Sequence, residues 1–432
     1  MTLTATYQQR TPASRVLSER ARAVMPGGNT RTCAHIDPYP LALVRGEGPH
    51  LWDADGNRYI DLNSNGLALI HGQAFGPVVD ALHAAAQQGT AWGGPSESQV
   101  RLAEVLCERL PSAEAVRFCA TGTEAGMLAA KVSRRATGRP LLLKAWHGYH
   151  GGYDDLEAGL HDNGELAGRV RLARYGDAAD FERVLDEAGL EIAAVVIEPT
   201  SVTGVVAPPD DFLPRLRAAT ERVGALLVFD ECITSRTAVG GLQQVTGVTP
   251  DLTMLGKYLG GGIPLGAVAG RREVLDHFDP ARHDHLYHSG SYNGSRLATT
   301  TGLATLAHLG DDAIAEMNGH ARTLAATLED AAAAAGVRLA VACVGSLIGL
   351  HFFRDEPRLA DDALQFEARE LFLLAAINEG VFLIPWDGVC GTSTAMSEAV
   401  AAEAGQRLGA ALEAVAGDLA ELEEAHRETA EP

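Results

Sequence analysis

Residues 225–231 read ALLVFDE, an apolar run that stops abruptly on the two acids Asp230 and Glu231. A short run without polar breaks is typical of a strand buried on both faces of a parallel sheet. Similar runs occupy residues 141–144, 192–197 and 265–269, and helix-like stretches separate them. This alternation between about residues 100 and 310 predicts an α/β fold with a mostly parallel central sheet flanked by helices.

The run at 192–197 also ends on an acid, Glu198. Ligands of open α/β sheets gather at the carboxyl ends of the strands. We therefore expect Glu198 and Asp230 to point toward one crevice.

The composition changes on either side of this region. The pattern of residues 1–60 predicts an N-terminal arm and a small ribbon of strands, because DADG and DADGN are turn signals between strand-like runs. After about residue 315 the chain is Ala-rich, with the strand-like segments LIGLHFF and VFLIPW inserted. We expect an arm and ribbon over 1–60, a large domain over 61–315, and a small C-terminal α+β domain over 316–432.

The charge balance bears on possible partners. The 432 residues include 35 Lys and Arg against 56 Asp and Glu, a formal net charge of −21. Nucleic acids and anionic membranes are bound by clustered basic residues, so neither is an expected partner. No apolar run approaches the ~18 residues of a membrane-spanning helix, and the first residues lack the apolar centre of a secretory signal. We expect a cytoplasmic protein.

Metal and disulfide chemistry are not indicated. The six cysteines are scattered without a C-x-x-C pair. His283, Asp284, His285 and His288 have suitable side chains for a metal, but no second clustered ligand set accompanies them. We expect no metal site.

The clearest local feature is Lys257, which stands between Gly256 and the triple glycine 260–262. Glycines there remove side-chain bulk where backbone passes close to another group. A surface lysine beside a flexible turn is the alternative reading. Together with Asp230, Lys257 suggests the pair used with pyridoxal phosphate, a lysine for the Schiff base and a carboxylate for the pyridinium nitrogen.

Three further segments carry chemistry. Residues 120–125, ATGTEA, place hydroxyls and free amides at a helix N-terminus, which is an anion site, although an ordinary N-cap explains the same residues. WHGYHG at 146–151 puts Tyr149 at the rim of the expected crevice, unless it is a core or turn tyrosine. HSGSYNGS at 288–295 is a hydroxyl-rich loop that opens a helix.

In this order and spacing, the segments resemble the class III aminotransferases of fold type I, which depend on pyridoxal 5′-phosphate. The matching motifs cover roughly residues 25 to 305 and are PGGNTR, LWDADGNRYIDL, TGTEA, TGR, HGYHG, IEP, GALLVFDE, PDLTMLGKYLGGGIPLGA and GSYNG. Within the family, glutamate-1-semialdehyde 2,1-aminomutase and the β-phenylalanine aminotransferase-like members are most similar in appearance. The resemblance makes 61–315 the pyridoxal-phosphate-binding domain.

The resemblance also implies roles for single residues. Lys257 would form the internal aldimine, and Asp230 would keep the pyridinium nitrogen protonated. The phosphate would be bound by Thr121, Gly122 and Thr123, while Tyr149 would stack on the cofactor ring and Cys232 would pack beneath it. Ser291 stands where the family usually has threonine and would reach the phosphate of the neighbouring subunit. Arg31 would bind a substrate carboxylate, with Glu198 as a further substrate contact.

Two departures from the family pattern concern the substrate. His71-Gly72 reverses the usual Gly-His, which leaves the contacts near residues 65–71 open. Where the β-phenylalanine relatives carry an arginine after proline, this chain reads Pro385-Trp386, which favours an aromatic or apolar pocket wall.

The motifs predict a homodimer with shared active sites that moves an amino group between a small-molecule amino donor and an oxo acceptor by a ping-pong mechanism. Two alternatives stay open. One is an isomerase with the same cofactor, an aminomutase or a racemase. The other is a catalytically silent homologue that serves as a binding subunit.

Overall fold

The computed structural model describes residues 2–160, 168–359, 363–383 and 388–430. The chain forms two compact units. The first comprises Met1–Phe75, Thr203–Val206 and Ala315–Pro432, and the second comprises Gly76–Val202 and Ala207–Ile314. The domain boundaries expected at residues 60 and 315 stay predictions. Every helix among the described residues is too short or too polar to span a lipid bilayer.

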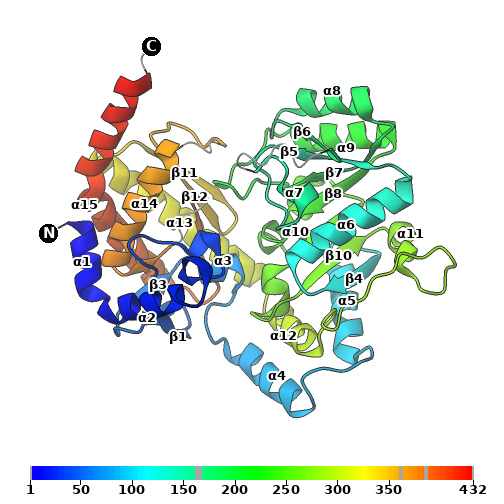
Figure 1. The fold of residues 1–432 in the computed structure, drawn as a ribbon, viewed down its shortest axis with the longest axis horizontal. Helices are drawn as coiled ribbons and strands as arrows, with labels where there is room; N and C mark the ends of the chain where they lie inside the picture. Colours follow the sequence, from blue (N-terminus) through cyan, green and yellow to red (C-terminus); the bar gives the residue numbers. More distant parts are fainter. Residues whose placement is uncertain (1, 161–167, 360–362, 384–387, 431–432) are drawn as a thin grey trace. The chain divides into compact units, whose positions relative to one another are not determined.

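The second unit is built on a seven-stranded sheet (Figure 1). In spatial order its strands are β4 (Ala115–Cys119), β10 (Gly266–Gly270), β9 (Leu252–Leu255), β8 (Leu226–Asp230), β7 (Ile192–Ile197), β5 (Leu141–Ala145) and β6 (Val170–Ala173). Strands β9, β8, β7, β5 and β6 pair in parallel, whereas β10 is antiparallel to both of its neighbours. The expected α/β fold with a mostly parallel sheet is confirmed.

Helices cover both faces of this sheet, as Figure 1 shows. The helices of this unit are α4 (Gly76–Gln87), α5 (Glu97–Arg109), α6 (Gly122–Thr137), α7 (Asp154–Glu157), α8 (Ala178–Ala188), α9 (Phe212–Val223), α10 (Gly241–Thr246), α11 (Arg272–Leu275) and α12 (Arg296–Ala307), with short 3-10 turns at η4 (Thr234–Arg236), η5 (Lys257–Gly260) and η6 (Asp276–Phe278). Along β7, Val196 belongs to the core under α6 and Val195 to the core under α8 and α9. Side chains of a strand alternate between the faces, so two buried faces require the uninterrupted apolar runs of the sequence.

The first unit contains two small sheets. One is the ribbon β1 (Leu43–Glu47), β2 (His50–Asp53) and β3 (Arg58–Asp61), to which β13 (Val381–Phe382) adds in parallel. The other is antiparallel and contains β11 (Leu339–Val344), β12 (Leu347–Phe352) and β14 (Val389–Gly391). The helices and 3-10 turns are α1 (Leu3–Arg10), α2 (Pro12–Arg22), η1 (Pro26–Gly28), η2 (Thr32–Ala34), α3 (Ser64–Leu67), α13 (Asp311–Ala335), α14 (Ala363–Asn378) and α15 (Glu398–Ala430). A single hydrophobic core joins N-terminal residues such as Tyr7 and Tyr59 with Phe372 of α14 and Leu412 of α15.

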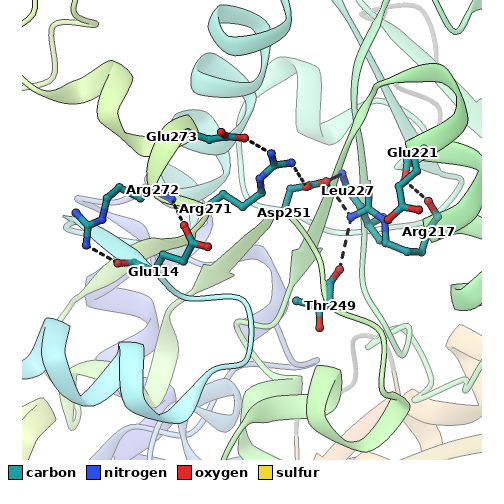
Figure 2. A network of polar contacts seen from close by, with 10 residues as sticks. Glu114, Arg217, Glu221, Leu227, Thr249, Asp251, Arg271, Arg272 and Glu273 are labelled. Carbon is teal, nitrogen blue, oxygen red and sulfur yellow. Dashed lines mark hydrogen bonds and ion pairs between the residues drawn. The ribbon is translucent and has the colours of Figure 1, made fainter.

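A buried aspartate, Asp251, forms hydrogen bonds with several elements at the amino-terminal edge of the sheet. Asp251 immediately precedes β9 and is 5% exposed. Its Oδ2 accepts hydrogen bonds from the backbone N of Leu227 at 2.7 Å and from Nη1 of Arg217 at 2.9 Å, and its Oδ1 accepts one from Nη1 of Arg271 at 2.7 Å (Figure 2). These partners come from β8, α9 and the segment after β10, so one carboxylate connects four elements.

We expect Asp251→Ala to destabilise the protein by about 3 kcal/mol, because it leaves buried donors without their acceptor. The change would be measured as a lower midpoint of urea unfolding at an unchanged slope. The control is Glu221→Ala, which removes the exposed ion pair of Arg217 in the same network and should cost no more than about 0.5 kcal/mol. Equal midpoints for the two variants would contradict this assignment.

Candidate functional site

A cavity of about 170 Å³ lies in the second unit at the carboxyl ends of the central strands. Glu198 follows β7, Asp230 ends β8, and Lys257 comes two residues after β9. The carboxyl ends of parallel strands share one edge of a sheet, which is why residues far apart in sequence meet here. The lining residues are Thr121, Gly122, Thr123, Tyr149, His150, Gly151, Glu198, Val202, Asp230, Cys232, Ile233 and Lys257.

Asp230 is held as a carboxylate by two hydrogen bonds. Nδ1 of His150 lies 3.0 Å from Oδ2, and the backbone N of Cys232 donates to Oδ1 at 3.0 Å. Burial acts to raise the pKa of Asp230, but the bonds from His150 and Cys232 outweigh it and lower the pKa below its usual value. An ionised carboxylate only accepts hydrogen bonds, so Nδ1 of His150 carries the proton and donates.

His150 is neutral in this arrangement. Its side chain is 0% exposed, and burial lowers the pKa of the imidazole although Asp230 opposes the shift. Among the described residues, Nε2 has no hydrogen-bond partner. A Cβ at Gly148 would come within 3.0 Å of this nitrogen, so the glycine leaves room for the ring.

Glu198 contrasts with Asp230. It is 4% exposed, and the hydrogen bond that it accepts from the backbone N of Val202 is long, at 3.4 Å. Burial and the nearby Asp230 charge raise the pKa of Glu198 well above its usual value, against the attraction of Lys257 and Lys144. The cavity thus contains two acids whose pKa values are shifted in opposite directions, downward for Asp230 and upward for Glu198.

Lys144 lies in β5 beside this pair. Its side chain is buried, and Nζ donates to the carbonyl oxygens of Gly148 at 2.8 Å and Leu156 at 2.5 Å. Burial lowers the pKa of Lys144 to about 8. Its two bonds fix the turn that carries Tyr149 and His150.

Three chain segments approach one another closely at Cys232, next to Lys257 in the wall of the cavity. A Cβ at Gly122 would lie 3.2 Å from Sγ of Cys232, and a Cβ at Gly256 would lie 3.3 Å from the same sulfur. Side chains larger than hydrogen are therefore excluded at both positions unless Cys232 moves. Lys257 itself has φ 52°, a left-handed conformation that costs a non-glycine residue about 1–3 kcal/mol and often marks a functional position.

The N-terminus of α6 opens on the same cavity. Oγ1 of Thr121 accepts from the backbone N of Glu124 at 3.2 Å, and the Glu124 carboxylate accepts from the backbone N of Ala120 at 2.7 Å. This reciprocal cap leaves the positive end of the helix dipole at Gly122 and Thr123, which line the cavity. The arrangement suits an anionic group such as a phosphate.

The structure brings most of the sequence-predicted site residues together. Thr121, Gly122, Thr123, Tyr149, Glu198, Asp230, Cys232 and Lys257 all line the cavity. Ser291 is exposed in the same unit and is not among the lining residues, Arg31 belongs to the first unit, and Trp386 lies outside the described residues.

Sequence reasoning missed His150 and Lys144. The HGYHG motif contained the signal for His150, because a second histidine beside the aromatic residue is available to pair with a buried acid. Lys144 ends the apolar run 141–144, and a lysine in a strand buried on both faces requires buried acceptors.

The titration of His150 should appear in the stability of the protein. Its folded-state pKa lies below 6.5, so the unfolded chain takes up the proton first and stability falls as the pH drops below 6.5. The contribution of Asp230 is lost only near and below its usual value of 3.8. Between pH 7 and 5, the unfolding free energy should therefore fall less for His150→Asn than for the wild type in urea titrations. Parallel profiles would show that His150 is protonated alike in both states.

Comparison with known proteins agrees with this geometry. Residues 33–396 match the family described as Aminotransferase class-III. The chain is 38% identical over 405 residues to glutamate-1-semialdehyde 2,1-aminomutase 2 of Bacillus cereus (strain ATCC 10987 / NRS 248), covering 88% of this chain and 93% of the relative. It superposes with a TM-score of 0.89 and 34% identity on a β-phenylalanine aminotransferase from Variovorax paradoxus, covering 97% of each chain. A transaminase with PLP bound gives a TM-score of 0.88 at 32% identity, with 95% of this chain and 99% of that chain covered. The protein therefore belongs to the class III aminotransferase family, whose members have fold type I and depend on pyridoxal 5′-phosphate.

Proposed function

We propose that the protein is an aminotransferase that moves an amino group between an amino acid and an oxo acid by a ping-pong mechanism. The observation that carries the proposal is the cavity itself, which is lined by Lys257, by Asp230 with its lowered pKa, and by a helix N-terminus. A β-amino acid is the favoured substrate class, since one structural relative is a β-phenylalanine aminotransferase.

The cavity residues fit pyridoxal 5′-phosphate. Bound there, the cofactor supplies an aldehyde for amine chemistry and a ring that accepts electrons. Lys257 offers the amine, and Asp230 offers a negative charge for the ring nitrogen. Thr121, Gly122 and Thr123 offer hydroxyls and amides for the phosphate.

The residues that line the cavity would have different roles in the reaction. Nζ of Lys257 would act as the base that takes up and returns the proton of the substrate carbon that bears the amino group. Tyr149 and Cys232, which both line the cavity, would pack against the cofactor ring. Glu198, as a neutral acid, adds a hydrogen-bond donor without a second negative charge.

An aminomutase or racemase is the second candidate, because one curated relative is a glutamate-1-semialdehyde 2,1-aminomutase. Such an enzyme rearranges one substrate without a free acceptor. A catalytically silent homologue is the third candidate, and the presence of both Lys257 and Asp230 favours an enzyme over it.

We expect the cofactor-loaded protein to transfer an amino group from β-phenylalanine to pyruvate or 2-oxoglutarate. Lys257→Ala should lower the rate by at least about 10³, because it removes the proton-transferring base, and should abolish the visible absorption gained on cofactor binding. The measurement is product formation over a panel of donors and acceptors, with absorption recorded in parallel.

Lys131→Ala is the matched control, since Lys131 lies on α6 and donates to the carbonyl of Tyr287 instead of lining the cavity. Turnover of one substrate without any acceptor would replace the aminotransferase by the isomerase. A protein that gains no visible absorption would be a silent homologue.

We also propose a cytoplasmic homodimer in which Ser291 reaches the partner's phosphate site. The exposed position of Ser291 on the loop before α12 supports this assignment. Ser291→Ala should weaken cofactor binding about tenfold by loss of one hydrogen bond to a charged group, measured by equilibrium dialysis. Sedimentation of a fully active monomer would contradict the shared site.

A further inference from the structure

Arg31 is oriented by a neutral partner. Its Nη1 donates to Oδ1 of Asn65 at 2.6 Å. Among the residues that the structure describes, the guanidinium makes one further side-chain hydrogen bond, a long one of 3.8 Å from Nη2 to Sγ of Cys33. Within the described part of the chain, no carboxylate lies at ion-pair distance from Arg31. An amide oxygen fixes the direction of a guanidinium but leaves its positive charge uncompensated, so the remaining donors stay available for an anion.

The loop that presents Asn65 is strained. Residues 64–67 have φ values of 47°, 56°, 67° and 66°, and three of the four are not glycine. Left-handed backbone of this kind costs about 1–3 kcal/mol per non-glycine residue and persists only where the surroundings impose it. The third residue, Gly66, allows the guanidinium to approach, because a Cβ there would lie 3.3 Å from Nη2 of Arg31.

Polar side chains impose the conformation. Oδ1 of Asp61 accepts from the backbone N of Asn63 at 3.0 Å and of Ser64 at 2.7 Å, while Oδ2 accepts from Nε2 of Gln73 at 2.8 Å. Oδ1 of Asn63 accepts from the backbone N of Gly66 at 2.9 Å. These hydrogen bonds fix the loop on both sides of Asn65. The side chain of Asn65 itself accepts the hydrogen bond from Arg31.

We propose that Asn65 is a positioning residue that orients Arg31 to bind the carboxylate of the amine substrate, and that it thereby sets a preference for amino acids over amines without a carboxylate. The proposal rests on the carboxylate-binding role that the family resemblance implies for Arg31 and on the aminotransferase activity proposed above. An aspartate at this position would neutralise the guanidinium and compete with the substrate, whereas a side chain without an acceptor would leave the guanidinium free to rotate.

The test compares β-phenylalanine with 1-phenylethylamine, which lacks only the carboxylate. Asn65→Gly removes the side chain without a conformational penalty, because glycine adopts the φ of 56° readily. Its ratio of kcat/KM for β-phenylalanine over 1-phenylethylamine should fall about tenfold through a higher KM at similar kcat. In Asn65→Asp the same ratio should fall further than in Asn65→Gly. The control Cys33→Ala, which removes the long contact to Nη2, should change the ratio less than twofold.

Two measurements separate positioning from a structural effect. In an Arg31→Ala background, Asn65→Gly should change the ratio less than twofold, because its partner is already absent. Calorimetry with 3-phenylpropanoate, a carboxylate without an amine, should show about tenfold weaker binding to Asn65→Gly than to the wild type. Equal losses for both amines, or the same loss without Arg31, would overturn the proposal. Carboxylate binding in a protein that transfers no amino group would overturn only the proposed aminotransferase activity.

Discussion

The hydrogen bond between His150 and Asp230 is the interaction on which the rest of the cavity depends. Asp230 ends the central strand β8 and is nearly excluded from solvent, a position that favours the neutral form of a carboxylic acid. The imidazole of His150 and the amide of Cys232 reverse that preference. Without them the cavity would lack the negative charge that, in the proposed function, Asp230 offers to the ring nitrogen of the cofactor.

The charge on Asp230 adds to burial in raising the pKa of its neighbour Glu198. Glu198 projects from the adjacent strand β7 into the same cavity, where a second negative charge is disfavoured by burial and repulsion. Two acids that look equivalent in the sequence thus have pKa values shifted in opposite directions. Lys144 donates hydrogen bonds to backbone carbonyls of the turn that carries His150 and so stabilises the position of His150 beside Asp230. Lys144 itself does not line the cavity.

Charge in this protein is distributed unevenly. The chain has a formal net charge of −21, while the N-terminus of α6 is the proposed contact of the phosphate and Arg31 that of the substrate carboxylate. Many arginines of the chain pair with acids, such as Arg217 and Arg271 with Asp251 (Figure 2). Arg31 instead contacts a neutral amide, which leaves it able to bind an anion.

The sequence by itself determined the sheet and the main residues of the cavity. Apolar runs such as 192–197 and 226–229 follow from burial on both faces, and the acids that end them mark the strand ends where Lys257 also lies. Only the tertiary structure decided in which direction the pKa of each acid is shifted and which residues distant in sequence are hydrogen-bonded to each other. His150 meets Asp230 across 80 positions and Asn65 meets Arg31 across 34, and no local periodicity encodes such pairs. Protonation and orientation depend on distance, desolvation and strained backbone, and these exist only once the chain has folded.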